Sequence, residues 1–163
     1  MLGVTRPRAE ALYEVLFGQF RGLFFIAPCL AAAPIGLVML AKRKQTRAEG
    51  AVALAIVGYY VLLNASYAYW DGGSSFGPRH LSPGIPFLCL GLAPLWTWTR
   101  QRPAIRLVLG ALAVYGAAVV LLAVSTSPLA SNAIAQPIGD YYWPLFRDGE
   151  LSSNRIGFTE LRA

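Results

Sequence analysis

The stretch Leu107-Val-Leu-Gly-Ala-Leu-Ala-Val-Tyr-Gly-Ala-Ala-Val-Val-Leu-Leu-Ala-Val-Ser125 decides the fold, because it is a long run of apolar residues without a single charge. A helix needs about 20 predominantly apolar residues to cross the hydrocarbon core of a bilayer. This run comes close to that length, so we predict a transmembrane helix over residues 107–125. Three similar uncharged runs precede it along the chain.

The composition of the whole chain agrees with a membrane protein. Of its 163 residues, 56% are hydrophobic and 13% are charged, whereas soluble domains carry about 25% charged residues. The formal net charge is +6. Because most of the positive charge lies in two short segments between apolar runs, it indicates membrane topology, and we expect no nucleic-acid partner.

The apolar runs predict an all-α integral membrane fold with about four transmembrane helices. The expected spans are residues 22–41, 50–70, 81–99 and 107–125. Residues 1–21 mix charges with helically spaced apolar residues, which predicts a short amphipathic helix on the membrane surface. Residues 1–125 would therefore form the membrane region, and the polar, turn-rich residues 126–163 would form an extramembrane tail.

The basic residues predict the orientation of these helices. Two loops between runs are rich in basic residues, which are Lys42, Arg43, Lys44 and Arg47 in one loop and Arg100, Arg102 and Arg106 in the other. Loops of this kind face the cytoplasm. The loop 70–80 and the tail would then be extracytoplasmic, in a multi-pass protein of the cell inner membrane. The three arginines of residues 1–21 oppose this orientation, and a preceding helix would remove the conflict.

The most distinctive polar stretch is Trp70-Asp-Gly-Gly-Ser-Ser-Phe-Gly-Pro-Arg-His80, between the second and third runs. Gly72, Gly73 and Gly77 permit a positive φ and let the backbone approach a ligand closely. Arg79 offers a planar fork of donors that suits a phosphate. Together these residues predict a small pocket for an anionic head group.

Asp71 and His80 add side chains of the type that exchange protons or bind hydroxyl groups. By composition alone, the loop fits better an ordinary tight connection, in which Asp71 ends a helix and Arg79 snorkels to the interface. No metal site or cofactor is expected, because the one histidine and the two cysteines, Cys29 and Cys89, form no ligand pattern.

Three stretches taken together carry a family resemblance. They are Arg21-Gly-Leu-Phe-Phe-Ile-Ala-Pro28, Trp70-Asp-Gly-Gly-Ser-Ser-Phe-Gly-Pro-Arg-His-Leu-Ser-Pro83, and Asp140-Tyr-Tyr-Trp-Pro-Leu-Phe146 followed by Gly149-Glu-Leu-Ser152. This set resembles the C-terminal part of bacterial multi-spanning C-type glycosyltransferases, similar to mannosyltransferases that use a polyprenyl-phosphate sugar. The resemblance implies an outer-face site in which Arg79, with Arg21 as a second candidate, binds the donor phosphate, while Gly72, Gly73 and Gly77 shape the approach.

The chain departs from that family in one respect. The family uses an acidic residue of its first outer loop as catalytic base, and this chain has no such region. Glu10, Glu14 and Asp71 receive no such role, so the catalytic residues are unknown. We expect a C-terminal module, or a fragment, that is incomplete for catalysis alone and works with an N-terminal half or a partner subunit.

Two other hypotheses are kept open. The chain is alternatively a non-catalytic small membrane protein, an assembly partner or scaffold that would be sensitive at helix-packing residues such as Gly110 and Gly116. A small transporter ranks lower, because the spans offer few polar side chains to line a path. The expected partners are membrane lipid, a polyprenyl-phosphate sugar and the missing half or subunit.

Overall fold

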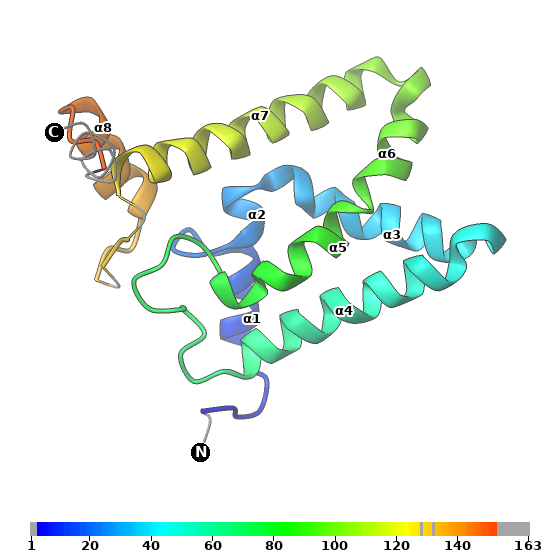
Figure 1. The fold of residues 1–163 in the computed structure, drawn as a ribbon, viewed down its shortest axis with the longest axis horizontal. Helices are drawn as coiled ribbons and strands as arrows, with labels where there is room; N and C mark the ends of the chain where they lie inside the picture. Colours follow the sequence, from blue (N-terminus) through cyan, green and yellow to red (C-terminus); the bar gives the residue numbers. More distant parts are fainter. Residues whose placement is uncertain (1–2, 128, 132, 153–163) are drawn as a thin grey trace, which may run out of the picture.

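The computed structural model describes residues 3–127, 129–131 and 133–152. Over these residues the fold is all-helical, with two isolated β-bridges and no strand (Figure 1). The α-helices are α1 (Ala9–Phe17), α2 (Leu23–Ile26), α3 (Ala33–Lys42), α4 (Arg47–Ser66), α5 (Ile85–Cys89), α6 (Leu92–Trp98), α7 (Pro103–Thr126) and α8 (Trp143–Arg147). Short 3-10 segments are η1 (Pro28–Ala32), η2 (Lys44–Thr46), η3 (Arg79–Gly84) and η4 (Thr99–Gln101), and η5 (Ile138–Tyr142) is a π-helix.

Two helical segments in this part of the chain are long and apolar enough to cross a membrane. They are Lys44–Ser66, which joins η2 to α4, and Pro103–Thr126, which is α7. A third is added if the pair Arg79–Cys89 and Leu92–Gln101, bent by 41°, forms one broken span. The prediction of transmembrane helices is thus confirmed for two or three segments.

The first apolar run, residues 22–41, differs from its prediction because it is not one helix. The helix α2 ends at Ile26, and Ala27 leaves the helical region with φ −130° and ψ 72°. Pro28 explains the break, since a proline disfavours the α conformation of the residue before it. The longest helical stretch in this run is Pro28–Lys42, which is shorter than a span.

Close backbone contact fixes the bend between α5 and α6. A Cβ added at Gly36 of α3 would overlap the carbonyl of Gly91, and one added at Gly91 would overlap the carbonyl of Ala33. Membrane helices pack closely where small residues face one another. The bend therefore lies where the α5–α6 connection presses against α3.

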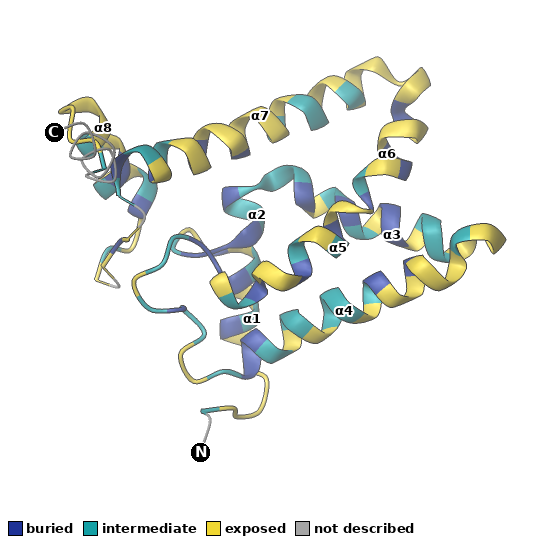
Figure 2. Cartoon of the chain, viewed as in Figure 1, coloured by how far each residue is buried: buried dark blue, intermediate teal, exposed yellow. Residues whose placement is uncertain are grey.

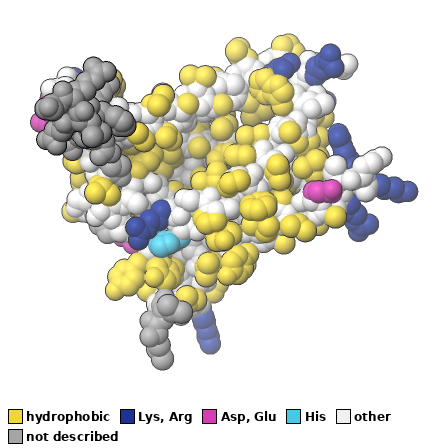
Figure 3. All heavy atoms as spheres, in the orientation of Figure 1, with side chains coloured by type: hydrophobic (Ala, Val, Ile, Leu, Met, Phe, Trp, Pro, Cys, Tyr) yellow, Lys and Arg dark blue, Asp and Glu magenta, His cyan; other side chains and the backbone are white. Residues whose placement is uncertain are grey.

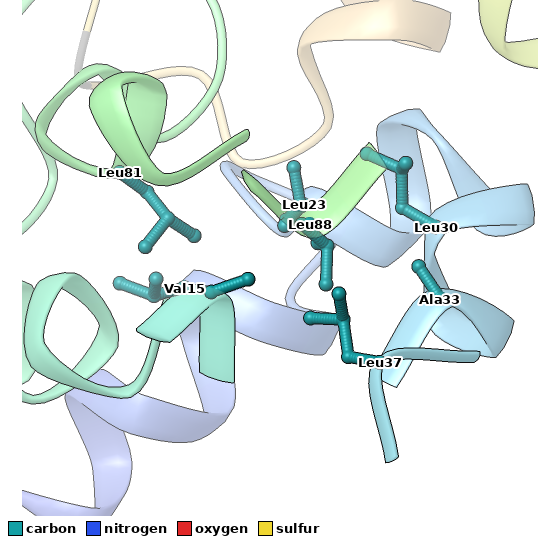
Figure 4. Packing of buried hydrophobic residues seen from close by; sticks show 8 residues of the cluster. Val15, Leu23, Leu30, Ala33, Leu37, Leu81 and Leu88 are labelled. Carbon is teal, nitrogen blue, oxygen red and sulfur yellow. The ribbon is translucent and has the colours of Figure 1, made fainter. Parts of the chain in front are cut away.

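The hydrophobic core lies between α1, α2, α3, α4 and α5 (Figure 4). Its buried members are Val15, Leu23, Leu30, Ala33, Leu37, Ala53, Leu81 and Leu88. In contrast, α7 lies at the edge of the bundle and exposes much of its length (Figure 2). Its Gly116 is buried against the α2–η1 junction, where an added Cβ would lie 3.2 Å from the Ala27 Cα.

The amphipathic segment is shorter than predicted. It forms α1 over Ala9–Phe17, and Met1 and Leu2 lie outside the described residues. Ala11 and Val15 are buried where α1 packs on α4, whereas Tyr13 and Phe17 are exposed. The helix is therefore attached to the bundle by one face and offers aromatic side chains on another.

The two basic loops lie at one end of the bundle, at the α3–α4 and α6–α7 connections (Figures 1 and 3). The loop 70–80, η5 and α8 lie at the opposite end. Residues 133–152 of the predicted tail pack there through η5 and α8 against α7, while residues 153–163 fall outside the described residues. The structure thus separates a basic end from an end that gathers the loop and the tail.

The substitution Gly116→Leu should destabilise the protein, because its side chain has no room beside Ala27 and the Ile26 carbonyl. Overpacking of this kind costs about 1–3 kcal/mol. We expect a lower midpoint in thermal unfolding in detergent micelles, followed by tryptophan fluorescence. Gly110→Leu is the matched control on the same helix, since a Cβ there meets nothing within 4 Å. Equal midpoints for both variants would contradict the packing of α7 described above.

Candidate functional site

The loop of residues 70–80, which we name the glycine loop, has the backbone conformation that its sequence predicts. Gly72, Gly73 and Gly77 have φ values of 74°, 69° and 70°. The hydroxyl of Ser75 donates to the carbonyl oxygens of Gly72 and Gly77, at 3.2 and 3.4 Å. These bonds close the loop on itself, so its shape is set by local contacts.

Two of these glycines are also required by their surroundings. A Cβ on Gly72 would lie 3.2 Å from the Arg79 Cγ, and one on Gly77 would lie 3.1 Å from the Ile26 Cδ1. At Gly73 an added Cβ meets nothing within 4 Å, so only its positive φ favours glycine. The aliphatic part of Arg79 therefore lies over the space that Gly72 leaves open.

Arg21 holds the glycine loop from the N-terminal side. It lies in the turn between α1 and α2, is 1% exposed, and donates from Nη2 to the carbonyl oxygen of Gly73 at 2.6 Å. Its Cζ lies 4.4 Å from the centre of the Phe20 ring. The sequence placed Arg21 and the loop on one side of the membrane, and the structure brings them into direct contact.

Arg21 lies within electrostatic reach of the other charged groups of the site. Burial lowers the pKa of Arg21, while the nearby Tyr142 and Asp71 raise it and Arg79 lowers it. An arginine remains protonated in proteins even so. The site therefore holds two guanidinium groups and one carboxyl group within electrostatic reach of one another.

The N-terminal segment pairs with the chain just before the glycine loop. The backbone N–H of Thr5 donates to the Ser66 carbonyl at 2.6 Å, and that of Ala68 donates to the Gly3 carbonyl at 2.7 Å. Arg8 Nη2 donates to the Tyr67 carbonyl at 3.1 Å. This pairing satisfies the carbonyls at the end of α4, which would otherwise lack partners.

The tail covers the opposite side of the glycine loop. The Ala130 N–H donates to the Ser74 carbonyl at 3.2 Å, and the ring of Phe76 meets Tyr142 edge-on at 5.3 Å between centroids. Tyr142 is 0% exposed, and its hydroxyl has no hydrogen-bond partner among the described residues. Burial raises the pKa of Tyr142, although Arg21 lowers it, so the phenol keeps its proton at neutral pH.

Arg79 and His80 differ in their surroundings. Arg79 is exposed, and its guanidinium makes no hydrogen bond or ion pair with any other described residue. His80 packs edge-on against Tyr67, with 5.0 Å between ring centroids, and its Nε2 is buried without a hydrogen-bond partner in the described part of the chain. Arg79 is therefore an exposed cation that the glycine loop itself offers to a ligand.

An apolar groove adjoins this end. It lies between α7 and α8, has a volume of about 510 Å³, and includes Tyr115, Leu122, Trp143 and Phe146 in its lining. Trp143 directly follows Tyr142 in the sequence, so the groove and the polar cluster share the segment η5–α8. No group of histidine, cysteine or acidic side chains in the described residues could hold a metal ion.

Sequence reasoning missed two polar residues at this end. Tyr142 belongs to the stretch Asp140–Phe146 and is not among the candidate site residues, although it reaches the glycine loop through Phe76. Asn64, near the end of α4, is 1% exposed, and neither amide atom has a hydrogen-bond partner among the described residues. The environments of Tyr142 and Asn64 depend on contacts between segments that are distant in the sequence. The local sequence pattern does not predict such contacts.

Comparisons with protein-family models, with curated proteins and with solved structures found no match to this chain.

The substitution Arg21→Met should loosen the glycine loop, because it removes the donor to the Gly73 carbonyl. Losing a charged hydrogen bond to a buried group costs about 1–3 kcal/mol. We expect faster trypsin cleavage after Arg79 in the folded protein in detergent, followed by mass spectrometry. Arg43→Met, an exposed arginine at the other end, is the control. A cleavage rate unchanged by Arg21→Met would show that this hydrogen bond does not restrain the loop.

Proposed function

We propose that the glycine loop binds the phosphate of a polyprenyl-phosphate-linked sugar, and that the chain is a membrane module of a glycosyltransferase. The observation that carries the proposal is the exposed Arg79, which has no partner among the described residues and stands on a loop held by its own hydrogen bonds. A second guanidinium, from Arg21, adds positive potential nearby. An anionic group is the ligand that such a site favours.

The residues of the site have separate roles in this proposal. Arg79 contacts the phosphate, and Gly72, Gly73 and Gly77 keep side chains away from its approach. Arg21 is a positioning residue, because its guanidinium is buried and bonded to the loop. Asp71 lies within electrostatic reach of Arg21 and His80, and its carboxyl group is of a type that binds sugar hydroxyls.

The apolar groove between α7 and α8 supports a ligand with a long hydrocarbon chain. Its lining is almost entirely apolar, and it includes Trp143, the residue that follows Tyr142 in the chain. A prenyl chain in this groove would bring its phosphate toward the glycine loop. The arrangement of a polar cluster beside an apolar groove matches the two parts of such a lipid.

The chemical step requires a catalytic base, and we assign none to this chain. We propose that an N-terminal half or a partner subunit supplies it from an outer loop, as the resemblance implies. In this arrangement the present chain binds the donor and does not complete the reaction by itself.

The proposal includes a topology. Residues 22–41 would cross the membrane as a broken helix, which gives four spans in the cell inner membrane together with α4, the bent segment and α7. The basic loops would be cytoplasmic, and the glycine loop and tail extracytoplasmic. The separation of these features to opposite ends of the bundle supports this arrangement.

Binding measurements test the phosphate site. Arg79→Ala should weaken binding of a short-chain polyprenyl phosphate to the protein in detergent by about tenfold, the factor that corresponds to one charge-assisted contact of about 1.4 kcal/mol. Arg79→Lys should weaken it less, because the charge remains without the fork.

The control for this measurement is Arg147→Ala. Arg147 is an exposed arginine at the same end and pairs with Asp148 at 3.2 Å. Binding that is unchanged in Arg79→Ala, with a folded protein, would rule out the assignment of Arg79.

The topology is tested by reporter fusions in a bacterial inner membrane. Fusions at Gln45 and Gln101 should read cytoplasmic, and fusions at Ser75 and Ser152 should read extracytoplasmic, because the basic loops are retained inside. A swapped pattern would place the glycine loop on the cytoplasmic face and remove an extracytoplasmic donor site.

The scaffold hypothesis rests on a different observation. Large apolar side chains on α7 are mostly exposed, including Leu107, Val114, Leu121 and Val124. A chain that serves only for assembly through this face would tolerate Arg79→Ala in every binding measurement. It would lose function instead when the packing of Gly116 is disturbed.

A further inference from the structure

A second candidate site lies at the basic end, between α6 and α7. Here a groove of about 680 Å³ is lined by Trp96 of α6 and by Leu107, Gly110 and Val114 of α7, with Arg106 also in its lining. A second hollow of about 530 Å³ shares Trp96 and Gly110 with the first. Apolar surface therefore extends on from Arg106 along the flank of α7.

Gly110 keeps this groove open. A Cβ added there meets nothing within 4 Å, whereas a Cβ at Gly116, further along the same helix, would press on Ala27. The helix α7 thus packs tightly at one glycine and leaves free space at the other. The groove lies between α6 and α7, away from the tight contact that α7 makes with Ala27.

Aromatic rings contact two arginines at the start of α7, of which Arg106 lines the groove and Arg102 lies one turn before it. The Cζ of Arg106 lies 4.2 Å from the Trp96 ring, and the Cζ of Arg102 lies 3.7 Å from the Trp98 ring. An indole face attracts a guanidinium without neutralising its charge. Both cations therefore stay available to an anion while their positions are restricted.

The charge around the mouth of the groove is strongly positive. Residues 42–49 and 99–106 carry Lys42, Arg43, Lys44, Arg47, Arg100, Arg102 and Arg106 against Glu49. Basic pockets between membrane helices bind the head groups of anionic lipids. The potential of this end thus selects a ligand with net negative charge.

We propose that the α6–α7 groove binds an anionic diacyl phospholipid. Its phosphate lies between Arg102 and Arg106, and one acyl chain follows the apolar groove past Trp96 and Gly110. A positive mouth and an apolar groove match the two parts of this molecule, whereas a zwitterionic lipid would bring a second cation toward the arginines. The inference uses neither the glycine loop nor the proposed function.

Tryptophan quenching tests this site in a Trp143→Phe background, which removes the tryptophan of the α7–α8 groove and keeps Trp96 in the lining of this one. The full chain in neutral detergent is titrated with phosphatidylglycerol brominated on its acyl chains, and with phosphatidylcholine brominated in the same way. We expect saturable quenching by phosphatidylglycerol at concentrations about fivefold lower than by phosphatidylcholine, for a head-group contact of about one basic residue.

Two variants remove the two halves of the site. Arg106→Gln should weaken phosphatidylglycerol binding about fivefold and reduce its preference over phosphatidylcholine. Gly110→Leu should weaken the binding of both lipids, since the new side chain occupies the groove. The matched controls are Arg147→Gln, at the opposite end, and Gly58→Leu on α4, where an added Cβ also meets nothing within 4 Å.

The outcomes are distinct. Weaker phosphatidylglycerol binding in Arg106→Gln, and weaker binding of both lipids in Gly110→Leu, support the site if both control variants bind as the unmodified protein does. Equal affinity for the two lipids in the unmodified protein would overturn it and indicate a nonselective lipid annulus. Unchanged binding in Arg106→Gln would overturn it also, whatever the result for Gly110→Leu.

Discussion

The hydrogen bond from the buried Arg21 guanidinium to the Gly73 carbonyl is the interaction on which one end of the molecule depends. A charge taken out of water is costly unless it is hydrogen-bonded and paired. This cost is offset only when the turn before α2, the glycine loop and the tail assemble together. Segments distant in the sequence are therefore fixed at the same place, and the exposed Arg79 stands on a support that is already ordered.

The fold could be predicted from the sequence where the signal is local. Uncharged length identified α4 and α7, and the glycines identified the positive-φ positions of the loop. The break at Ala27 could not be read reliably, because a proline within an apolar run either kinks a span or ends a helix. Whether residues 22–41 form a kinked span or end as a short helix decides between four spans and fewer, so the four spans stay a prediction.

The candidate site was predictable only in part, for a related reason. Arg79 and its glycines form one short stretch, so their proximity follows from the sequence. Tyr142 reaches the site through the packing of Phe76 and the tail, and the groove beside Gly110 forms between side chains of α6 and α7. Which helix faces pack together decides such contacts. Several faces of this chain have similar apolar composition, so hydropathy does not distinguish between them.

The contact between Gly36 and Gly91 has a consequence for bilayer thickness. By the rise of an α-helix, α7 is about 36 Å long, while a hydrocarbon core is about 30 Å thick. The segment Arg79–Gln101 cannot straighten to match a thicker bilayer without separating two backbones that already touch. A difference between helix length and bilayer thickness would therefore be accommodated by α7, which can tilt about its contact at Gly116. Membranes of different thickness would therefore change the width of the α6–α7 groove.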